Sequence, residues 1–150
     1  AKSDSPFNFY DPKQPIYTNS RVLPGSIVED SRLKDVLLSE GCRIQKAEIT
    51  HSVVGVRSQI RAGTRIKNCI LMGSDYYDQP GKSNDIPLGV GPKCDIEGAI
   101  LDKNVRLGKG VIIRPFPRGT DKDTETWVVR DGIVVIPKDV QIAAGTVIAP

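Results

Sequence analysis

Aliphatic residues recur six positions apart along most of the chain, and this spacing restricts the folds that the sequence can adopt. A six-residue period matches neither an α-helix nor an ordinary β-strand. The pairs with this spacing are Ile27 and Leu33, Ile60 and Ile66, Val90 and Ile96, Val105 and Val111, and Val134 and Val140. A second interval of sixteen or seventeen residues aligns three series: Ile27, Ile44 and Ile60; Leu33, Ile49 and Ile66; and Leu37, Val54 and Leu71. Three short strands per repeat, each with one inward aliphatic residue, stack such series into columns, so the pattern predicts a parallel β-helix.

The predicted β-helix is a single all-β domain over residues 1–150, a length sufficient for one core. With three strands per turn, the coils of such a β-helix form a triangular prism whose walls are parallel sheets. We expect residues 25–150 to form these coils. Residues 1–24 are expected to form an extended lead-in, with Tyr10 and Tyr17 packed against a wall of the prism. Two stretches break the period, at about 73–89 and 114–131, and are predicted to be extruded loops. A β-sandwich is the alternative for this composition, but the three aligned series argue against it.

The cysteines and the charge exclude several classes of protein. The chain has three cysteines, Cys42, Cys69 and Cys94, which lie far apart in the sequence. Their odd number and wide spacing exclude a disulfide framework and favour buried free thiols. A zinc site that includes His51 is the less favoured alternative, because the spacings match no compact ligand motif. The formal net charge of +3 does not indicate nucleic-acid binding, and no apolar run is long enough to span a membrane. We therefore expect neither a nucleic-acid nor a membrane partner.

Six short sequence motifs, called phrases below, resemble those of a known protein family. They are FYD at 9–11, PIYT at 15–18, HSVVGVRS at 51–58, LMGSDYY at 71–77, LDKNVRLG at 101–108 and GIVV at 132–135. In this order they resemble the C-terminal domain of glucose-1-phosphate adenylyltransferase, also called ADP-glucose pyrophosphorylase. The six-residue pattern itself is similar to that of left-handed hexapeptide-repeat β-helices. The resemblance covers nearly the whole chain and implies a left-handed parallel β-helix.

The resemblance implies a regulatory and oligomerisation domain. The family enzyme makes ADP-glucose and pyrophosphate from ATP and glucose 1-phosphate for glycogen or starch synthesis, and its N-terminal nucleotidyltransferase domain uses ATP and Mg²⁺. This sequence shows no glycine-rich nucleotide loop and no clear acidic pair for Mg²⁺. We therefore expect the chain to lack the catalytic domain, to be inactive alone and to hold no cofactor, metal or catalytic residue. The implied partners are its own N-terminal catalytic domain and other subunits, in a bacterial cytoplasm or a plant plastid.

The resemblance also implies a site for an anionic effector, namely phosphate, 3-phosphoglycerate or a fructose phosphate. Lys103 and Lys138 match family lysines implicated in activator binding, and Asp102 matches the acid beside the first of them. Arg21 matches a family arginine that helps to bind an anion near the domain junction. Convergent lysine and arginine side chains suit such a ligand, because guanidinium binds phosphate in a fork and ammonium adds a mobile charge. Differences from the family pattern after Tyr77, over 114–126 and at Pro137 and Asp131 leave the effector's identity open.

Two stretches are basic and contain no acidic residue. The first, 103–119, holds Lys103, Arg106, Lys109, Arg114 and Arg118, and the second, 57–67, holds Arg57, Arg61, Arg65 and Lys67. Arg106, Arg114 and Arg130 are further candidate anion contacts. The alternative is that these side chains form a solvated outer face that keeps the prism soluble and guards its edges.

Two other functions stay open at this stage. The domain could be a purely structural assembly module, because a β-helix exposes unpaired backbone at both ends. Hexapeptide-repeat acyltransferases use one histidine as a general base, which would give His51 a catalytic role, but the chain shows no recognisable coenzyme A segment. Trp127 is expected to anchor its loop rather than to stack on a ligand.

Overall fold

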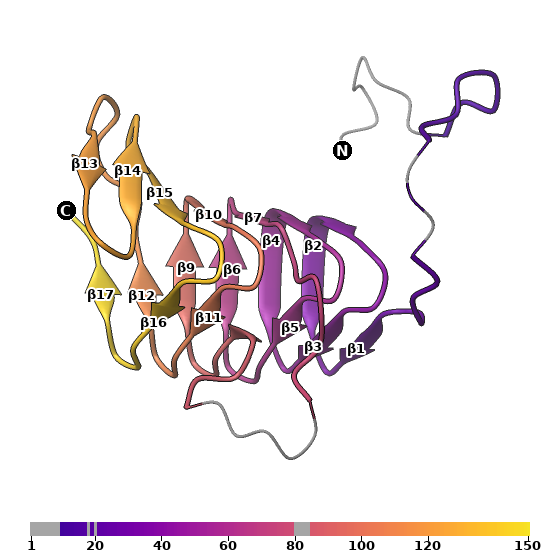
Figure 1. Cartoon of the computed structure of the whole chain (residues 1–150), viewed down its shortest axis with the longest axis horizontal. Helices are drawn as coiled ribbons and strands as arrows, with labels where there is room; N and C mark the ends of the chain where they lie inside the picture. Colours follow the sequence, from indigo (N-terminus) through magenta and orange to yellow (C-terminus); the bar gives the residue numbers. More distant parts are fainter. Residues whose placement is uncertain (1–9, 18, 20, 80–84) are drawn as a thin grey trace.

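Short strands wind around a common axis in the computed structural model, which describes residues 10–17, 19, 21–79 and 85–150 (Figure 1). Seventeen strands are found in these residues, connected by turns and bends. This described part contains no helix, and hence none that could cross a membrane.

The first wall of the prism is a 6-stranded parallel sheet. Its strands, in spatial order, are β1 (Ile27–Glu29), β3 (Arg43–Gln45), β5 (Gln59–Ile60), β8 (Gly89–Val90), β11 (Arg106–Leu107) and β16 (Gln141–Ile142). Each strand pairs with the equivalent strand of the next coil, which is the pairing that a parallel β-helix requires.

The second and third walls belong to one 11-stranded sheet, because two long strands bend around the corner between them. These strands are β2 (Arg32–Leu38) and β4 (Glu48–Val54), and they turn at Asp35 and His51, whose φ angles are +54° and +48°. The second wall continues with β6 (Arg65–Lys67), β9 (Asp95–Glu97), β12 (Ile112–Ile113) and β17 (Val147–Ile148). The third wall continues with β7 (Ile70–Leu71), β10 (Ala99–Leu101) and β15 (Ile133–Ile136).

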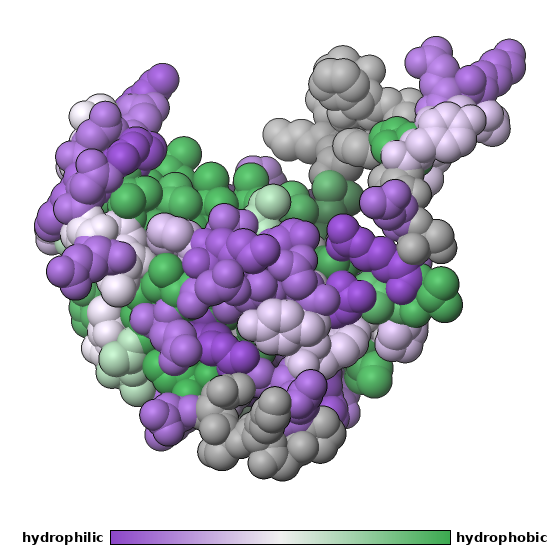
Figure 2. Space-filling view, in the orientation of Figure 1, coloured by the Kyte–Doolittle hydropathy of each residue, from purple (hydrophilic) through white to green (hydrophobic). Residues whose placement is uncertain are grey.

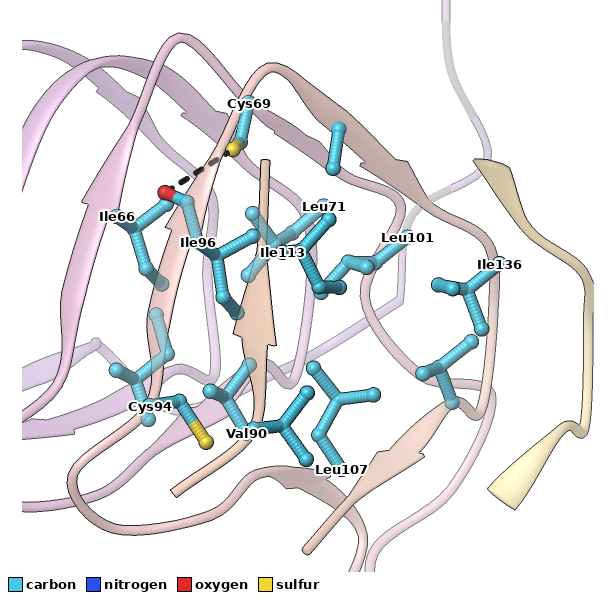
Figure 3. Close-up of a cluster of buried hydrophobic side chains, with 14 of the residues drawn as sticks. Ile66, Cys69, Leu71, Val90, Cys94, Ile96, Leu101, Leu107, Ile113 and Ile136 are labelled. Carbon is cyan, nitrogen blue, oxygen red and sulfur yellow. Dashed lines mark hydrogen bonds between the residues drawn. The ribbon is translucent and has the colours of Figure 1, made fainter. Parts of the chain in front are cut away.

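Buried aliphatic side chains form three columns inside the prism, as the sequence predicts (Figure 3). The first column is Ile44, Ile60, Val90, Leu107 and Ile142; the second is Ile49, Ile66, Ile96, Ile113 and Ile148; the third is Val54, Leu71, Leu101 and Ile136. All of these side chains are at most 4% exposed, so the columns are the hydrophobic core.

The predicted register is wrong by one residue at two positions of the first coil. Val28 rather than Ile27 pairs with Ile44, and Leu38 rather than Leu37 pairs with Val54. Ile27 and Leu37 are 53% and 37% exposed. The error arises because the residue next to each of these positions is also aliphatic, and a shift of one residue moves a side chain to the opposite face.

Smaller side chains fill a second inward position, two residues before most of the column residues; Leu88, before Val90, is the exception. The three cysteines lie at such positions and are free and buried, which confirms the prediction for them. Hydroxyl groups at equivalent positions accept hydrogen bonds from the cysteine backbone: Ser52 Oγ lies 3.1 Å from Cys69 N, and Thr64 Oγ1 lies 3.3 Å from Cys94 N. Burial raises the pKa of all three thiols. The cysteines therefore serve packing rather than chemistry.

The stretch 114–131, predicted to be a loop, contains a β-hairpin. Its strands β13 (Lys122–Asp123) and β14 (Val128–Arg130) pair antiparallel, and β14 extends the third wall by pairing with β15. The hairpin projects at the upper left of Figure 1. Trp127 packs against Phe116, with ring centroids 6.1 Å apart, and so anchors this stretch as expected. The alternation around fully buried Val129 is the strand signal that the prediction missed.

Only parts of the lead-in and of the connection between β7 and β8 are described. Residues 10–17 lie away from the coils, and Tyr10 and Tyr17 are 87% and 92% exposed (Figure 1). The prediction that both rings pack on the wall is therefore wrong. Residues 1–9, 18 and 20 of the lead-in and 80–84 of the predicted loop lie outside the described residues.

Candidate anion-binding site

Both predicted effector lysines lie at the corner that joins the third wall to the first. Backbone hydrogen bonds connect successive coils there: Asn104 N–H donates to Gly73 O at 3.1 Å, and Asp139 N–H donates to Lys103 O at 3.0 Å. Lys103 and Lys138 therefore occupy equivalent positions on adjacent coils, although the β13–β14 hairpin separates them in the sequence. Asn104 and Asp139 turn the corner with φ angles of +61° and +62°, a conformation that Asn and Asp adopt more readily than most residues.

The two lysines converge on a single carboxylate, that of Asp75. Lys103 Nζ lies 2.7 Å from Asp75 Oδ1, and Lys138 Nζ lies 3.0 Å from Asp75 Oδ2. Asn104 Nδ2 also donates to Asp75 Oδ2, at 3.2 Å, while Asn104 Oδ1 accepts from the Asp75 backbone N–H at 2.8 Å. We call the residues that meet here the lysine cluster. It consists of Asp75, Lys103, Asn104 and Lys138, together with Asp102 and Asp139, which bind the backbone of Lys103 and the side chain of Asn104. Hydrophilic side chains gather over the connections β10–β11 and β15–β16, in the middle of the view in Figure 2.

The electrostatics of the lysine cluster follow from these contacts. Hydrogen bonds from Lys103 and then Lys138 hold the pKa of Asp75 well below its ordinary value, and Asp75 in turn raises the pKa of Lys138. All three groups are reachable from solvent, since the side chains of Lys103, Asp75 and Lys138 are 29%, 37% and 50% exposed.

Two further acidic residues support the lysines without contacting their amines. Asp102 Oδ1 accepts a hydrogen bond from the backbone N–H of Lys103 at 2.7 Å, which fixes the corner from which the Lys103 side chain extends. Asp139 Oδ1 accepts from Asn104 Nδ2 at 2.8 Å. Asp102 therefore orients Lys103, and the predicted residues Asp102, Lys103 and Lys138 are brought together in one place.

The chain after β7 carries Asp75 and is fastened at several points. Gly73 begins it with a φ of +84°, and a Cβ there would lie 2.1 Å from Val56 O, so only glycine fits. The Tyr77 hydroxyl donates to Gly41 O at 2.9 Å. Arg106 donates to Asp78 Oδ1 at 2.6 Å and to Ile86 O at 2.9 Å, and so clamps both ends of the connection to the coils.

The other candidate anion contacts lie elsewhere and pair with protein groups. Arg106 is only 7% exposed and is held by Asp78. Arg114 Nη2 lies 2.7 Å from Asp95 Oδ2, and Arg130 Nη2 binds Asp123 Oδ1 on the hairpin. Arg21 lines an open groove with Glu40 and Val56, at the first-coil end of the same corner. Three strand spacings of about 4.8 Å, roughly 14 Å, separate the level of Glu40 from that of Lys103, so Arg21 lines a groove apart from the lysine cluster.

The second basic stretch, 57–67, is spread over different walls. Arg57 lies over the Tyr77 ring and donates to Ser74 O, whereas Arg61 donates to Leu88 O at 2.9 Å. Arg65 pairs with Asp95 and Lys67 pairs with Glu97. These side chains connect coils and loops and do not form one anion site.

His51 lies at a different corner, where its Nδ1 is 2.8 Å from Asn68 Oδ1. Both residues have positive φ angles at equivalent corner positions, so the pair belongs to the turn between the second and third walls. Among the described residues, no group of three or more His, Cys, Asp or Glu side chains could hold a metal ion.

Sequence reasoning missed Asp75 and Asn104. Both lie within phrases that carry the family resemblance, LMGSDYY and LDKNVRLG, but neither phrase shows that the two residues meet. An alignment of the coil corners would have placed residues 73 and 103 at one level, and with them Asp75 beside Lys103.

The parallel walls, the aliphatic columns and the turned corners define a β-helix domain. A family model, the GLGC left-handed parallel beta-helix domain, matches residues 21–147 and gives the coil its hand. The chain therefore belongs to this family, the C-terminal domain of glucose-1-phosphate adenylyltransferase, or ADP-glucose pyrophosphorylase. The predicted fold and family are thus confirmed, and the match favours this family over the acyltransferase interpretation of His51.

Proposed function

We propose that this domain binds a phosphorylated or other anionic metabolite at Lys103 and Lys138 and so regulates ADP-glucose pyrophosphorylase. The observation that carries the proposal is the convergence of both amines on one carboxylate, at 2.7 and 3.0 Å. A carboxylate is itself an anion with two acceptor oxygens, so the geometry that holds Asp75 also suits two oxygens of a phosphate group. Family membership supports the role in this enzyme.

In the proposed arrangement the chemistry belongs to another part of the enzyme. The nucleotidyltransferase domain would use ATP and Mg²⁺ to convert glucose 1-phosphate into ADP-glucose and pyrophosphate, and the β-helix would act on it through a change in anion occupancy. Regulation of this kind requires two sites and two states, and the lysine cluster is the effector site of the pair. Candidate effectors are 3-phosphoglycerate, fructose 1,6-bisphosphate and inorganic phosphate.

Thermal unfolding in the presence of each candidate effector tests the proposal. A ligand that binds only the folded chain stabilises it by RT ln(1 + [L]/Kd), about 2.7 kcal/mol at one hundred times Kd. We expect a saturable rise in Tm with one of the three ligands. Lys103→Ala and Lys138→Ala should each weaken the apparent affinity at least tenfold, because each removes a charge-assisted hydrogen bond.

Lys109→Ala is the matched control for these variants. Lys109 is exposed and lies at another corner, where its carbonyl accepts from Gly145 N–H, so the substitution removes one positive charge without touching the lysine cluster. The proposal predicts that this variant keeps the wild-type response. A response that all three variants reduce equally would indicate non-specific charge binding and would contradict the proposal.

An apolar band on the outer face of the third wall favours a second candidate function, assembly with another copy of the chain. The band consists of in-register outward side chains on five strands: Leu37, Val53, Ile70, Ile100 and Val135. Leu37, Val53 and Ile70 are 37%, 37% and 42% exposed, and hydrophobic residues line this upper edge in Figure 2. Continuous exposed apolar surface of this kind marks protein interfaces.

Sedimentation velocity over a range of concentrations tests the assembly function. Association should weaken in a Leu37→Ser, Ile70→Ser double variant, which removes apolar surface without changing charge. Val147→Ser is the control, because Val147 is 61% exposed on β17, the last described strand of the second wall, away from the band. Loss of association in the control alone would place the contact at the end of the coil and not at the band.

A further inference from the structure

Asp75 fills the place that the proposed effector would take. Both of its carboxylate oxygens accept hydrogen bonds, one from Lys103 and the other from Lys138 and Asn104. The donors extend from adjacent coil corners, whereas Asp75 extends from the connection between β7 and β8. The site therefore already contains an anion, supplied by a separate segment of the chain.

The charges of the lysine cluster do not favour a second anion while Asp75 remains in place. Asp75, Asp102 and Asp139 carry three negative charges against the two positive charges of Lys103 and Lys138, which leaves a net charge of −1. A phosphate dianion that approached this arrangement would meet a negative field and amines whose hydrogen bonds are partly used. Departure of Asp75 from the amines would free donors on both lysines at once.

The strength of the Asp75 contacts is compatible with displacement. An exposed ion pair in water changes an equilibrium constant by no more than about fivefold, because solvent and salt screen it. The three charged side chains are 29–50% exposed, so their pairing falls near this class. A phosphate carries more charge and more acceptor oxygens than a carboxylate, and its bonds to two amines are correspondingly stronger. At sufficient concentration, phosphate therefore displaces the Asp75 carboxylate from the two amines.

We propose that Asp75 is an internal competing anion, which occupies Lys103 and Lys138 when no effector is bound and which the effector displaces. This inference rests on the proposed function of the lysine cluster. Asp75 thereby sets the concentration at which the effector binds. Because Asp75 lies on a connection fastened to the coils by Tyr77 and Arg106, its displacement is a local change of the Asp75 side chain.

Isothermal titration calorimetry with inorganic phosphate at constant ionic strength tests this role. Asp75→Asn keeps the shape of the side chain and removes its charge, and we expect it to bind phosphate about fivefold more tightly than the wild type. Asp139→Asn is the control, because it makes the same change of charge in the same cluster at a carboxylate that accepts a hydrogen bond from Asn104 Nδ2, whereas both amines pair with Asp75. Asn also tolerates the positive φ of this position. We expect this control to tighten binding by no more than about twofold.

The outcomes separate this inference from the proposed function. If the wild type binds phosphate through the two lysines but Asp75→Asn binds it no better than Asp139→Asn does, the internal competitor is overturned and the effector site stands. Weaker binding by Asp75→Asn would show that Asp75 positions the lysines for the ligand and would overturn the inference equally. Absence of binding to the wild type and to both Asp75 variants would overturn both proposals. Asp75→Ser, which is too short to reach the amines, provides the second variant should Asp75→Asn fail to fold.

Discussion

Arg106 and Lys103 lie on the same coil and both bind a carboxylate of the connection that follows β7, yet the two contacts differ in burial. The Arg106 side chain is 9% exposed and donates to both oxygens of Asp78 as well as to a backbone carbonyl. Lys103 is 29% exposed and shares Asp75 with a second lysine. The arginine pair is built into the structure, whereas the lysine pair remains open to exchange with solvent and ligands. Burial and geometry, and not the density of positive charge in the sequence, separate a structural contact from a candidate binding site.

The largest effect is expected from Arg106→Ala. The substitution leaves Asp78 without its main partner and releases both ends of the connection, so unfolding should become easier by about 3 kcal/mol, which lowers Tm by roughly 6–12 °C. Thermal and urea unfolding would measure this change. Arg106→Lys, which keeps the charge but loses the fork, should fall between the wild type and the alanine variant. A change in Tm below about 2 °C for Arg106→Ala would show that the buried pair is not structural.

The lysines are expected to matter far less for stability. Lys103→Ala and Lys138→Ala each break an exposed ion pair, so each should change Tm by less than about 3 °C in the absence of ligand. The same thermal scans used for Arg106→Ala provide the comparison. A loss of stability as large as that of Arg106→Ala would remove the distinction between the two contacts.

The pH dependence of stability tests the pairing of Asp75 with the two lysines. The pKa of Asp75 lies below its ordinary value of 3.8 in the folded chain, so its contribution to stability is fully present above that value and is lost as the pH falls toward the folded pKa. The difference in unfolding free energy between the wild type and Asp75→Asn should therefore stay constant from pH 5 to 7 and shrink below pH 4. Urea unfolding at a series of pH values measures it. A difference that grew on acidification would reverse the sign of the coupling.

The smallest effect concerns the protonation of Lys138. Asp75 is the main cause of the raised pKa of this lysine, so Asp75→Asn should lower the pKa of Lys138 toward its ordinary value. NMR titration of the lysine Cε and Nζ signals between pH 8 and 12 would follow it. An unchanged curve for Lys138 would mean that the two side chains do not pair in solution.

The sequence predicts most of the fold because the aliphatic columns are an internal repeat. The register error in the first coil has a plain cause: neighbouring aliphatic residues at 27 and 28 and at 37 and 38 satisfy the pattern equally well. The β13–β14 hairpin was missed because its strands are short and one of them is wholly exposed. The alternation around Val129 is a signal of only three residues, and the strand that it indicates depends on pairing with β15.

The candidate site was only partly predictable. Lys103, Lys138 and Asp102 came from the family resemblance, and the structure brings them together. Charge runs alone do not identify one site, since the further candidates Arg106, Arg114 and Arg130 pair with three different carboxylates away from the lysine cluster. Asp75 was missed because its role depends on a connection that meets two coil corners, which only an alignment of those corners would have indicated.

The central claim is that one anion is bound jointly by Lys103 and Lys138, and NMR of the lysine side chains during titration with 3-phosphoglycerate tests it most directly. The account predicts that the Nζ signals of Lys103 and Lys138 shift together with a single Kd, while those of Lys109 and the other exposed lysines stay in place. Separate dissociation constants for the two lysines, or equal small shifts of all lysines, would contradict it.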